Sequence, residues 1–235
     1  MKKLYGVLAT FVAAIFITAV ALCVQALSVP QSVSAFSQSG MTVVVDAGHG
    51  GIDGGVVGKK TGVKESDINL AIARLLKIEL EELGFTVALT RKTQAGLYDT
   101  TAKGFKKRDM QKRKEIIQDI QPALVISVHQ NYYSSGAYRG GQVFYDGESA
   151  QGKAFAAAVQ EKINGLYGRE NAKPRTEKTG DFFMLKCCEN PSILVECGFL
   201  SNAKDEALLI SEGWQKRLAQ AIAAGALAYF SQSAS

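Results

Sequence analysis

From residue 41 onward, short runs of β-branched and aliphatic residues alternate with longer segments in which apolar residues recur at helical spacing. The short runs indicate strands, and the longer segments indicate amphipathic helices. We expect strands at residues 41–45, 85–89, 123–128, 142–145 and 192–195, and helices at 66–83, 106–120, 153–166 and 212–230. Because such alternation covers a sheet with helices on both faces, we predict a three-layer α/β/α sandwich with a mostly parallel central sheet.

The first run, residues 41–45, is continuously apolar, which is typical of a central strand that is buried on both faces. A segment crowded with Gly and Asp follows at residues 46–58, and we expect it to be a loop. In open α/β sheets, functional groups gather at the carboxyl ends of the strands. Polar residues that directly follow the predicted strands are therefore the first candidates for chemistry.

The N-terminal 40 residues differ in composition from the rest of the chain. Lys2 and Lys3 precede an uncharged, mostly apolar run at residues 4–24, and a Ser/Gln-rich stretch follows at 28–40. This order is typical of a secretory signal, but a run of 21 residues is also long enough to anchor the chain in a bilayer. We predict a signal peptide or N-terminal membrane anchor at 1–27, a linker at 28–40 and one extracytoplasmic domain at 41–231. Membrane contact is expected only through the N-terminal segment.

Charge and cysteine usage limit the classes of function that the chain can have. The chain has 27 basic and 22 acidic residues, so that without Lys2 and Lys3 the balance is 25 to 22, or +3. This charge is too weak and too dispersed to indicate nucleic-acid binding. The domain holds Cys187, Cys188 and Cys197 without a CxxC pair. Since adjacent cysteines bridge poorly, we expect buried free thiols and no structural zinc site of that type.

The chain contains two histidines, and both follow predicted strands. His49 comes after the run at residues 42–45, and His129 comes directly after the run at 124–128. Neighbouring parallel strands would bring the two imidazoles together. Imidazole is a common neutral metal ligand, and a pair of histidines with one carboxylate is typical of catalytic zinc sites.

Three carboxylates could complete such a site. Glu65 lies at the start of a predicted helix, where the helix dipole alone would favour an acid, and Asp67 is a rival on the same grounds. Glu196 is different because it ends a predicted buried strand, where a carboxylate is costly unless it is paired or functional. We therefore expect Glu196 to lie beside the two histidines.

Four motifs occur in order along the chain: Val45-Asp46-Ala47-Gly48-His49-Gly50-Gly51, Glu65 before Asn69-Leu70, Ser127-Val128-His129-Gln130-Asn131, and Leu194-Val195-Glu196-Cys197-Gly198-Phe199-Leu200-Ser201-Asn202. Over about residues 41–230 this series closely resembles the zinc-dependent N-acetylmuramoyl-L-alanine amidases of bacterial cell-wall metabolism. The resemblance implies that the metal, Zn²⁺, is held by His49, Glu65 and His129 and that Glu196 is catalytic. It also favours Glu65 over Asp67.

The implied reaction is hydrolysis of the peptidoglycan amide bond between N-acetylmuramic acid and L-alanine. Glu196 would take a proton from water and return it to the departing amine, since an amide leaves poorly without a proton. Residues 101–105 and the basic helix after them are similar to the spore-associated, germination-specific branch. That branch implies a role in spore cortex maturation, where muramic lactam forms, and a location in the forespore intermembrane space. Whether zinc binds unaided or needs an activating protein partner stays open.

Several positions complete or depart from the family pattern. Arg91 and Arg113 match common family positions. Cys197 stands where threonine is usual, and Tyr132 stands where a small residue is common, so Tyr132 is expected to reshape the substrate groove. Asp46 could orient a liganding histidine or could structure the loop.

Three other interpretations are weighed against the amidase. A zinc exopeptidase on a similar scaffold would need cationic residues for a terminal carboxylate, and a non-catalytic wall-binding or regulatory module would be expected to lack a ligand or Glu196. A nucleophilic pair of Cys197 and His129 is disfavoured because Glu196 already takes the inward-facing position of that strand.

A basic cluster is expected to be a solvated helix face or a contact for anionic wall polymer or a partner; it comprises Lys103, Lys106, Lys107, Arg108, Lys112, Arg113 and Lys114.

Overall fold

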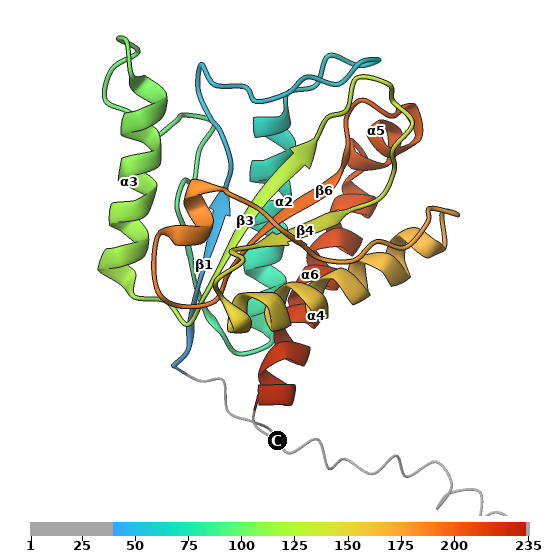
Figure 1. The fold of residues 1–235 in the computed structure, drawn as a ribbon. Coiled ribbons are helices and arrows are strands. Elements are labelled where there is room, and N and C mark those ends of the chain that lie inside the picture. Colours follow the sequence, from blue (N-terminus) through green and yellow to red (C-terminus); the bar gives the residue numbers. More distant parts are fainter. Residues whose placement is uncertain (1–39, 234–235) are drawn as a thin grey trace, which may run out of the picture. The chain divides into compact units, whose positions relative to one another are not determined.

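A computed structural model describes residues 40–233 of the chain (Figure 1). The predicted signal or anchor at 1–27 and nearly all of the predicted linker at 28–40 lie outside the described residues. Among the helices of residues 40–233, none combines the length and the apolar composition needed to cross a membrane.

Six strands form one sheet, in the order β2-β1-β3-β6-β4-β5. Their bounds are β1 (Thr42–Ala47), β2 (Thr86–Leu89), β3 (Leu124–Asn131), β4 (Gln142–Tyr145), β5 (Lys178–Thr179) and β6 (Ser192–Phe199). Strands β2, β1, β3 and β6 are mutually parallel, and β4 pairs antiparallel with β6. The prediction of a mostly parallel sheet is confirmed.

Helices cover both faces of this sheet. One face carries α2 (Glu65–Glu82), α4 (Ala150–Gly168) and α6 (Glu212–Ser233), and the other carries α3 (Phe105–Ile120) and a 3₁₀ turn, η1 (Phe183–Lys186). Figure 1 shows the strands between α3 and the group of α2, α4 and α6. The three predicted layers are thus present.

The alternation of side chains along β1 explains why the strand is apolar at every position. Val43 and Val45 belong to the large core under α2, α4 and α6, whereas Val44 packs in a smaller core with Ile117 of α3 and Met184 of η1. Successive side chains of a strand point to opposite faces, so a strand between two helix layers needs apolar residues throughout.

The structure extends three strands, β1, β3 and β6, beyond the predicted bounds and adds three short elements. β3 and β6 continue to Asn131 and Phe199 instead of stopping at residues 128 and 195, because they pair with each other past His129. The sequence analysis missed β5, η1 and α5 (Ala203–Leu209), which are too short to show a period. Within α5, the Asn202 side chain accepts from the backbone N–H groups of Lys204 and Asp205 and so caps the helix.

Candidate metal centre

The chain turns sharply after β1, and two glycines let its backbone pass close to the candidate ligands. A Cβ on Gly48 would lie 2.3 Å from the imidazole of His129, and a Cβ on Gly55 would lie 2.4 Å from Oε2 of Glu65. His49 itself has a φ of 61°, in the left-handed region that a side chain with a Cβ rarely adopts. The turn therefore accepts local strain to aim His49 at the site, which is typical of functional positions.

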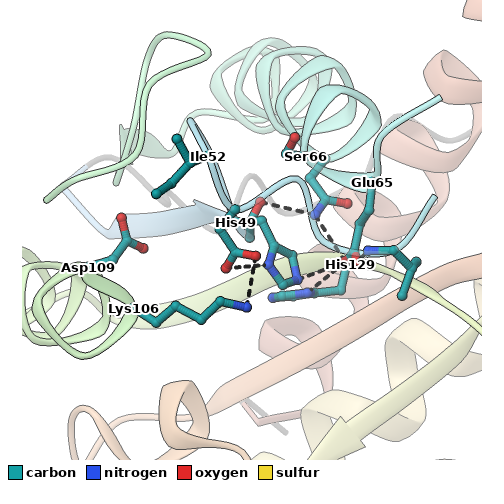
Figure 2. Close-up of polar contacts among 12 residues, drawn as sticks. His49, Ile52, Glu65, Ser66, Lys106, Asp109 and His129 are labelled. Carbon is teal, nitrogen blue, oxygen red and sulfur yellow. Dashed lines mark hydrogen bonds and ion pairs between the residues drawn. The ribbon is translucent and has the colours of Figure 1, made fainter. Parts of the chain in front are cut away.

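His49, Glu65 and His129 converge at the carboxyl edge of the sheet (Figure 2). One ligand atom from each of these residues lies within 4.8 Å of the ligand atoms of the other two. Within the described residues, this is the group whose geometry could hold a metal ion. Oε1 of Glu65 is 3.4 Å from Nε2 of His49 and 2.9 Å from Nδ1 of His129. Two imidazole nitrogens and one carboxylate oxygen at this spacing fit a metal ion that keeps a position open for water.

Glu65 is held in place before any metal arrives. As the first residue of α2, it is buried, and its carboxylate accepts hydrogen bonds from the backbone N–H groups of Val56 at 2.9 Å and Gln130 at 3.0 Å. Burial opposes its charge, but the hydrogen bonds and charges of His129 and His49 outweigh burial and hold the pKa of Glu65 well below its usual range. The carboxylate is therefore ionised at neutral pH, as a ligand must be. Asp67, the rival, lies outside the cluster.

Glu196 lies in β6 directly opposite His129 of β3 in the parallel register. Its Oε2 is buried and has no hydrogen-bond partner among the described residues. Burial raises the pKa of Glu196 to about 7, against the opposing charge of His129. A partly buried carboxyl group with one buried, unpartnered oxygen and a pKa near neutrality has the properties of a general base.

Cys197 points to the other side of β6. It is fully buried in the large core, and burial raises the pKa of its thiol far above the usual range. This placement does not support the nucleophilic pairing of Cys197 with His129. Cys187 and Cys197 are buried free cysteines, as predicted, whereas Cys188 is free but only partly buried.

Asp46 anchors a buried polar network under the site. It accepts from the hydroxyls of Ser127 and Thr90, each at 2.6 Å, and forms an ion pair with Arg113. Burial opposes its charge, but Arg113 and the two hydroxyls lower the pKa of Asp46 to about 2. These partners join the ends of β1 and β3 to α3. They support a role for Asp46 in structuring the loop, and not the alternative role of orienting a liganding histidine.

Two arginines that match family positions bind the backbone carbonyls around His49. Arg91 donates to the carbonyls of Ala47, Gly48 and Ser66, and Arg113 donates to those of Ala47 and His49. The expectation of a solvated basic face was therefore wrong for Arg113, which is 1% exposed. A helix that contributes a cation to a buried network cannot be distinguished by sequence from one that faces solvent.

The sequence analysis missed Asp53 as a partner of the site. Its Oδ2 lies 3.0 Å from Nδ1 of His49, and its Oδ1 lies 3.1 Å from Nζ of Lys106. Figure 2 shows Lys106 reaching from α3 toward His49. Burial lowers the pKa of His49, but Glu65 and Asp53 outweigh it and raise the pKa to about 9. The only available signal was the spacing of four residues from His49 within a loop.

A cavity of about 240 Å³ opens beside the cluster. His49, Asp53, Lys106 and His129 form a polar wall, and the other wall is apolar, with Met110, Phe182, Phe183, Met184 and Leu194. Such a cavity can bind a substrate that has both polar and apolar parts next to the ligand cluster.

An α/β sheet with a two-histidine, one-glutamate cluster at its carboxyl edge, and with a second glutamate whose buried oxygen lacks a partner, has the kind of site that metal-dependent hydrolases use. Comparison with known proteins identifies the family within this class. Residues 43–228 match the family model of the N-acetylmuramoyl-L-alanine amidases, and the chain belongs to this family.

Individual relatives agree with this assignment. The chain is 32% identical over 197 residues to the germination-specific N-acetylmuramoyl-L-alanine amidase of Bacillus subtilis, covering 83% of this chain and 81% of that protein. The solved CwlD amidase of Clostridioides difficile, in complex with the GerS lipoprotein, superposes with a TM-score of 0.78 at 36% identity, covering 82% of this chain and 99% of that one. The catalytic domain of CwlV from Bacillus (Paenibacillus) polymyxa gives a TM-score of 0.71 at 31% identity, covering 81% of this chain and 98% of that one. The resemblance to the germination-specific branch is thereby confirmed.

Proposed function

We propose that the chain hydrolyses the amide bond between N-acetylmuramic acid and L-alanine, with Zn²⁺ held by His49, Glu65 and His129 and with Glu196 as general base. The observation that carries this proposal is the placement of Glu196, whose buried Oε2 lacks a hydrogen-bond partner within the described residues while its strand neighbour is His129. A buried carboxyl oxygen without a hydrogen-bond partner is unfavourable for folding, so its presence beside a ligand cluster supports a role in chemistry.

The reaction divides between the metal and the protein. When bound, zinc would supply Lewis acidity, which lowers the pKa of water and polarises the scissile carbonyl. Glu196 accepts the proton of the attacking water and then donates it to the departing amine of L-alanine. Asp53 fixes the imidazole of His49 through Nδ1, so that Nε2 faces Glu65 and the ligand position.

The buried carboxyl group of Glu196 suits both halves of this proton transfer. A pKa of about 7 lets the group be ionised when water attacks and still hold the proton until the amine departs.

The biological setting follows from the relatives. A germination-specific amidase of Bacillus subtilis is among them, so we place this chain in spore cortex maturation, where it would remove stem peptides before muramic lactam forms. The N-terminal charge and apolar run favour an extracytoplasmic location, including the forespore intermembrane space. The CwlD amidase was solved with the GerS lipoprotein, and we propose by analogy that this chain also works with an activating protein partner.

Mass spectrometry of peptidoglycan digests tests the reaction and the substrate together. The zinc-loaded protein is incubated with spore and vegetative peptidoglycan, and the products are separated. We expect free stem peptides with an N-terminal L-alanine and glycan that has lost them. Release of single amino acids from free peptides would instead identify an exopeptidase. An absence of any product would favour a non-catalytic binding module.

A further inference from the structure

Three tyrosines are exposed where the chain leaves β3. Tyr132, Tyr133 and Tyr138 lie in the β3–β4 connection and are 41%, 50% and 48% exposed. We call these residues the tyrosine platform. Large aromatic side chains gathered on a surface indicate a binding site more often than a structural need.

The platform is built from stacked rings. Tyr138 contacts Tyr133 edge to face, with ring centroids 4.7 Å apart, and stacks on the buried Phe199 at 6.0 Å. The guanidinium of Arg175 lies 5.8 Å from the ring centre of Tyr138 and 5.1 Å from that of Phe199. On the other side, Nζ of Lys59 lies 5.7 Å from the ring centre of Tyr132. A cation therefore lies against a platform ring at two places, Lys59 at Tyr132 and Arg175 at Tyr138.

The loop that carries the tyrosines is fixed by hydrogen bonds. The backbone N–H of Tyr133 donates to the hydroxyl of Ser201 at 2.9 Å, and the amide of Asn202 donates to the carbonyl of Gly136 at 2.6 Å. Nζ of Lys59 donates to the carbonyl of Ser134 at 2.7 Å. A preorganised loop binds a ligand with a smaller loss of conformational entropy than a mobile one does.

A groove of about 390 Å³ lies against Tyr138. Its main lining residues are Tyr138, Arg139, Asn171, Lys173, Pro174 and Arg175, and no carboxylate lines it. Arg139 is neutralised by an ion pair with the buried Asp205 at 3.0 Å. Lys173 and Arg175 are left to give the groove a positive charge, which favours an anionic ligand.

The groove and the platform lie at the same edge of the sheet as the metal centre. Tyr132 is three residues beyond His129 in β3, and Phe199 is three residues beyond Glu196 in β6. At about 3.3 Å per strand residue, Phe199, on which Tyr138 stacks, lies roughly 10 Å along β6 from Glu196. A saccharide strand whose amide bond lies at the metal centre would extend over distances of this order.

We propose that the tyrosine platform and the adjoining groove bind the glycan strand of peptidoglycan beyond the residue being cut. Pyranose rings have flat C–H faces that stack on tyrosines, and neighbouring stem peptides carry carboxylates that complement Arg175 and Lys173. This inference rests on the proposed function, because the occupant is the polymer whose amide bond is cleaved. It makes the enzyme selective for polymer over short fragments.

Co-sedimentation with purified peptidoglycan sacculi tests the platform without catalysis. The parent is the full-length chain with Glu196→Gln, and tubes without sacculi give the background. The double variant Tyr133→Ala/Tyr138→Ala should bind about ten-fold more weakly, as expected for aromatic residues that dominate an interface. Tyr138→Phe keeps the ring and should bind within about two-fold of the parent. Arg175→Gln should weaken binding and reduce its salt dependence.

Matched controls are Ile78→Ala, an equally exposed apolar residue on α2, and Arg169→Gln, which lines a separate hollow against α6. Both should bind like the parent. If the double variant also binds like the parent, the platform does not contact glycan and its tyrosines serve a protein partner instead. If the double variant fails to fold, Arg175→Gln decides alone, and unchanged binding and salt dependence overturn the proposal. Binding is independent of hydrolysis, so a wild-type protein that releases no stem peptides would refute only the proposed function.

Discussion

Asp53 is the residue whose role is most directly open to a single substitution. It accepts from Nδ1 of His49 and leaves Nε2 to face Glu65. Partners of this kind fix the tautomer and orientation of a liganding imidazole, and their loss typically costs about 10–100-fold in metal affinity. Asp53→Asn should therefore weaken zinc binding by about that factor, measured by competition with a chromophoric chelator. Asp181→Asn, a control at a carboxylate that is 92% exposed, should leave the affinity unchanged.

Glu196 should make the metal-free fold dependent on pH. Its folded pKa of about 7 lies above the ordinary value of 4.5, so ionisation destabilises the folded state as the pH rises between these values. Glu196→Gln removes this penalty. At pH 8 the variant should exceed the wild type in free energy of unfolding by about 3 kcal/mol, since each unit of pKa shift is worth about 1.4 kcal/mol.

Chemical denaturation of the metal-free proteins at pH 4.5 and pH 8 checks this prediction. At pH 4.5 the difference should be small, because Glu196 is protonated in the folded state. Glu161→Gln, at a side chain that is 70% exposed, should behave like the wild type at both values. Equal stability of Glu196→Gln and wild type at pH 8 would show that burial of Glu196 has no energetic cost.

Among the elements, Arg113 joins α3 directly to the carboxyl end of β1. It pairs with Asp46 and with Asp109, whose Oδ2 is 2.6 Å from its Nε, and both arginine contacts are buried. Arg113→Met would leave these acids buried without their cation, which costs about 3–5 kcal/mol. Urea denaturation should show this loss. Lys112→Met, at the neighbouring residue that is 57% exposed, should change stability by less than about 0.5 kcal/mol.

The elements that sequence predicted best are those with a clear period. The run at 41–45 and the helical spacing at 66–83 led to the central strand and to α2, and the placement of His49 and His129 after strands led to the ligand cluster. Asp53 and Arg113 could not be predicted in the same way. A loop carboxylate and a cation on a basic helix acquire their partners only when the chain folds, through contacts 4 and 67 residues apart.

For the chain as a whole, we expect the N-terminal segment to direct the domain out of the cytoplasm. Residues 1–40 fused to a reporter should carry the reporter across the membrane, since positive charge followed by an apolar run directs export. Gel mobility would then distinguish a cleaved signal from an anchor. Replacing Lys2 and Lys3 by Glu is the matched control and should reduce export. Recovery of the whole reporter in the cytosol would rule out an extracytoplasmic role.

The assembled site brings together one edge of the sheet, the start of α2 and the loop after β1. In the proposed mechanism its two glutamates have different roles, one as a metal ligand and the other as general base. Glu65 is buried and ionised between two histidines, whereas Glu196 is partly buried, has a buried Oε2 without a hydrogen-bond partner among the described residues, and has a pKa of about 7. The same substitution at both positions should thus have different consequences. Gln keeps the shape of each side chain but cannot accept a proton from water and is a weaker metal ligand.

The decisive measurement is zinc stoichiometry together with release of stem peptides for Glu196→Gln and Glu65→Gln, with Glu161→Gln as control. Glu196→Gln should retain zinc and lose turnover by about 10²–10⁴-fold, the usual contribution of a general base. Glu65→Gln should lose zinc at the same metal concentration, and Glu161→Gln should match the wild type in both respects. Loss of zinc by Glu196→Gln with retention by Glu65→Gln would reverse the two roles, and near-normal turnover by Glu196→Gln would contradict the mechanism.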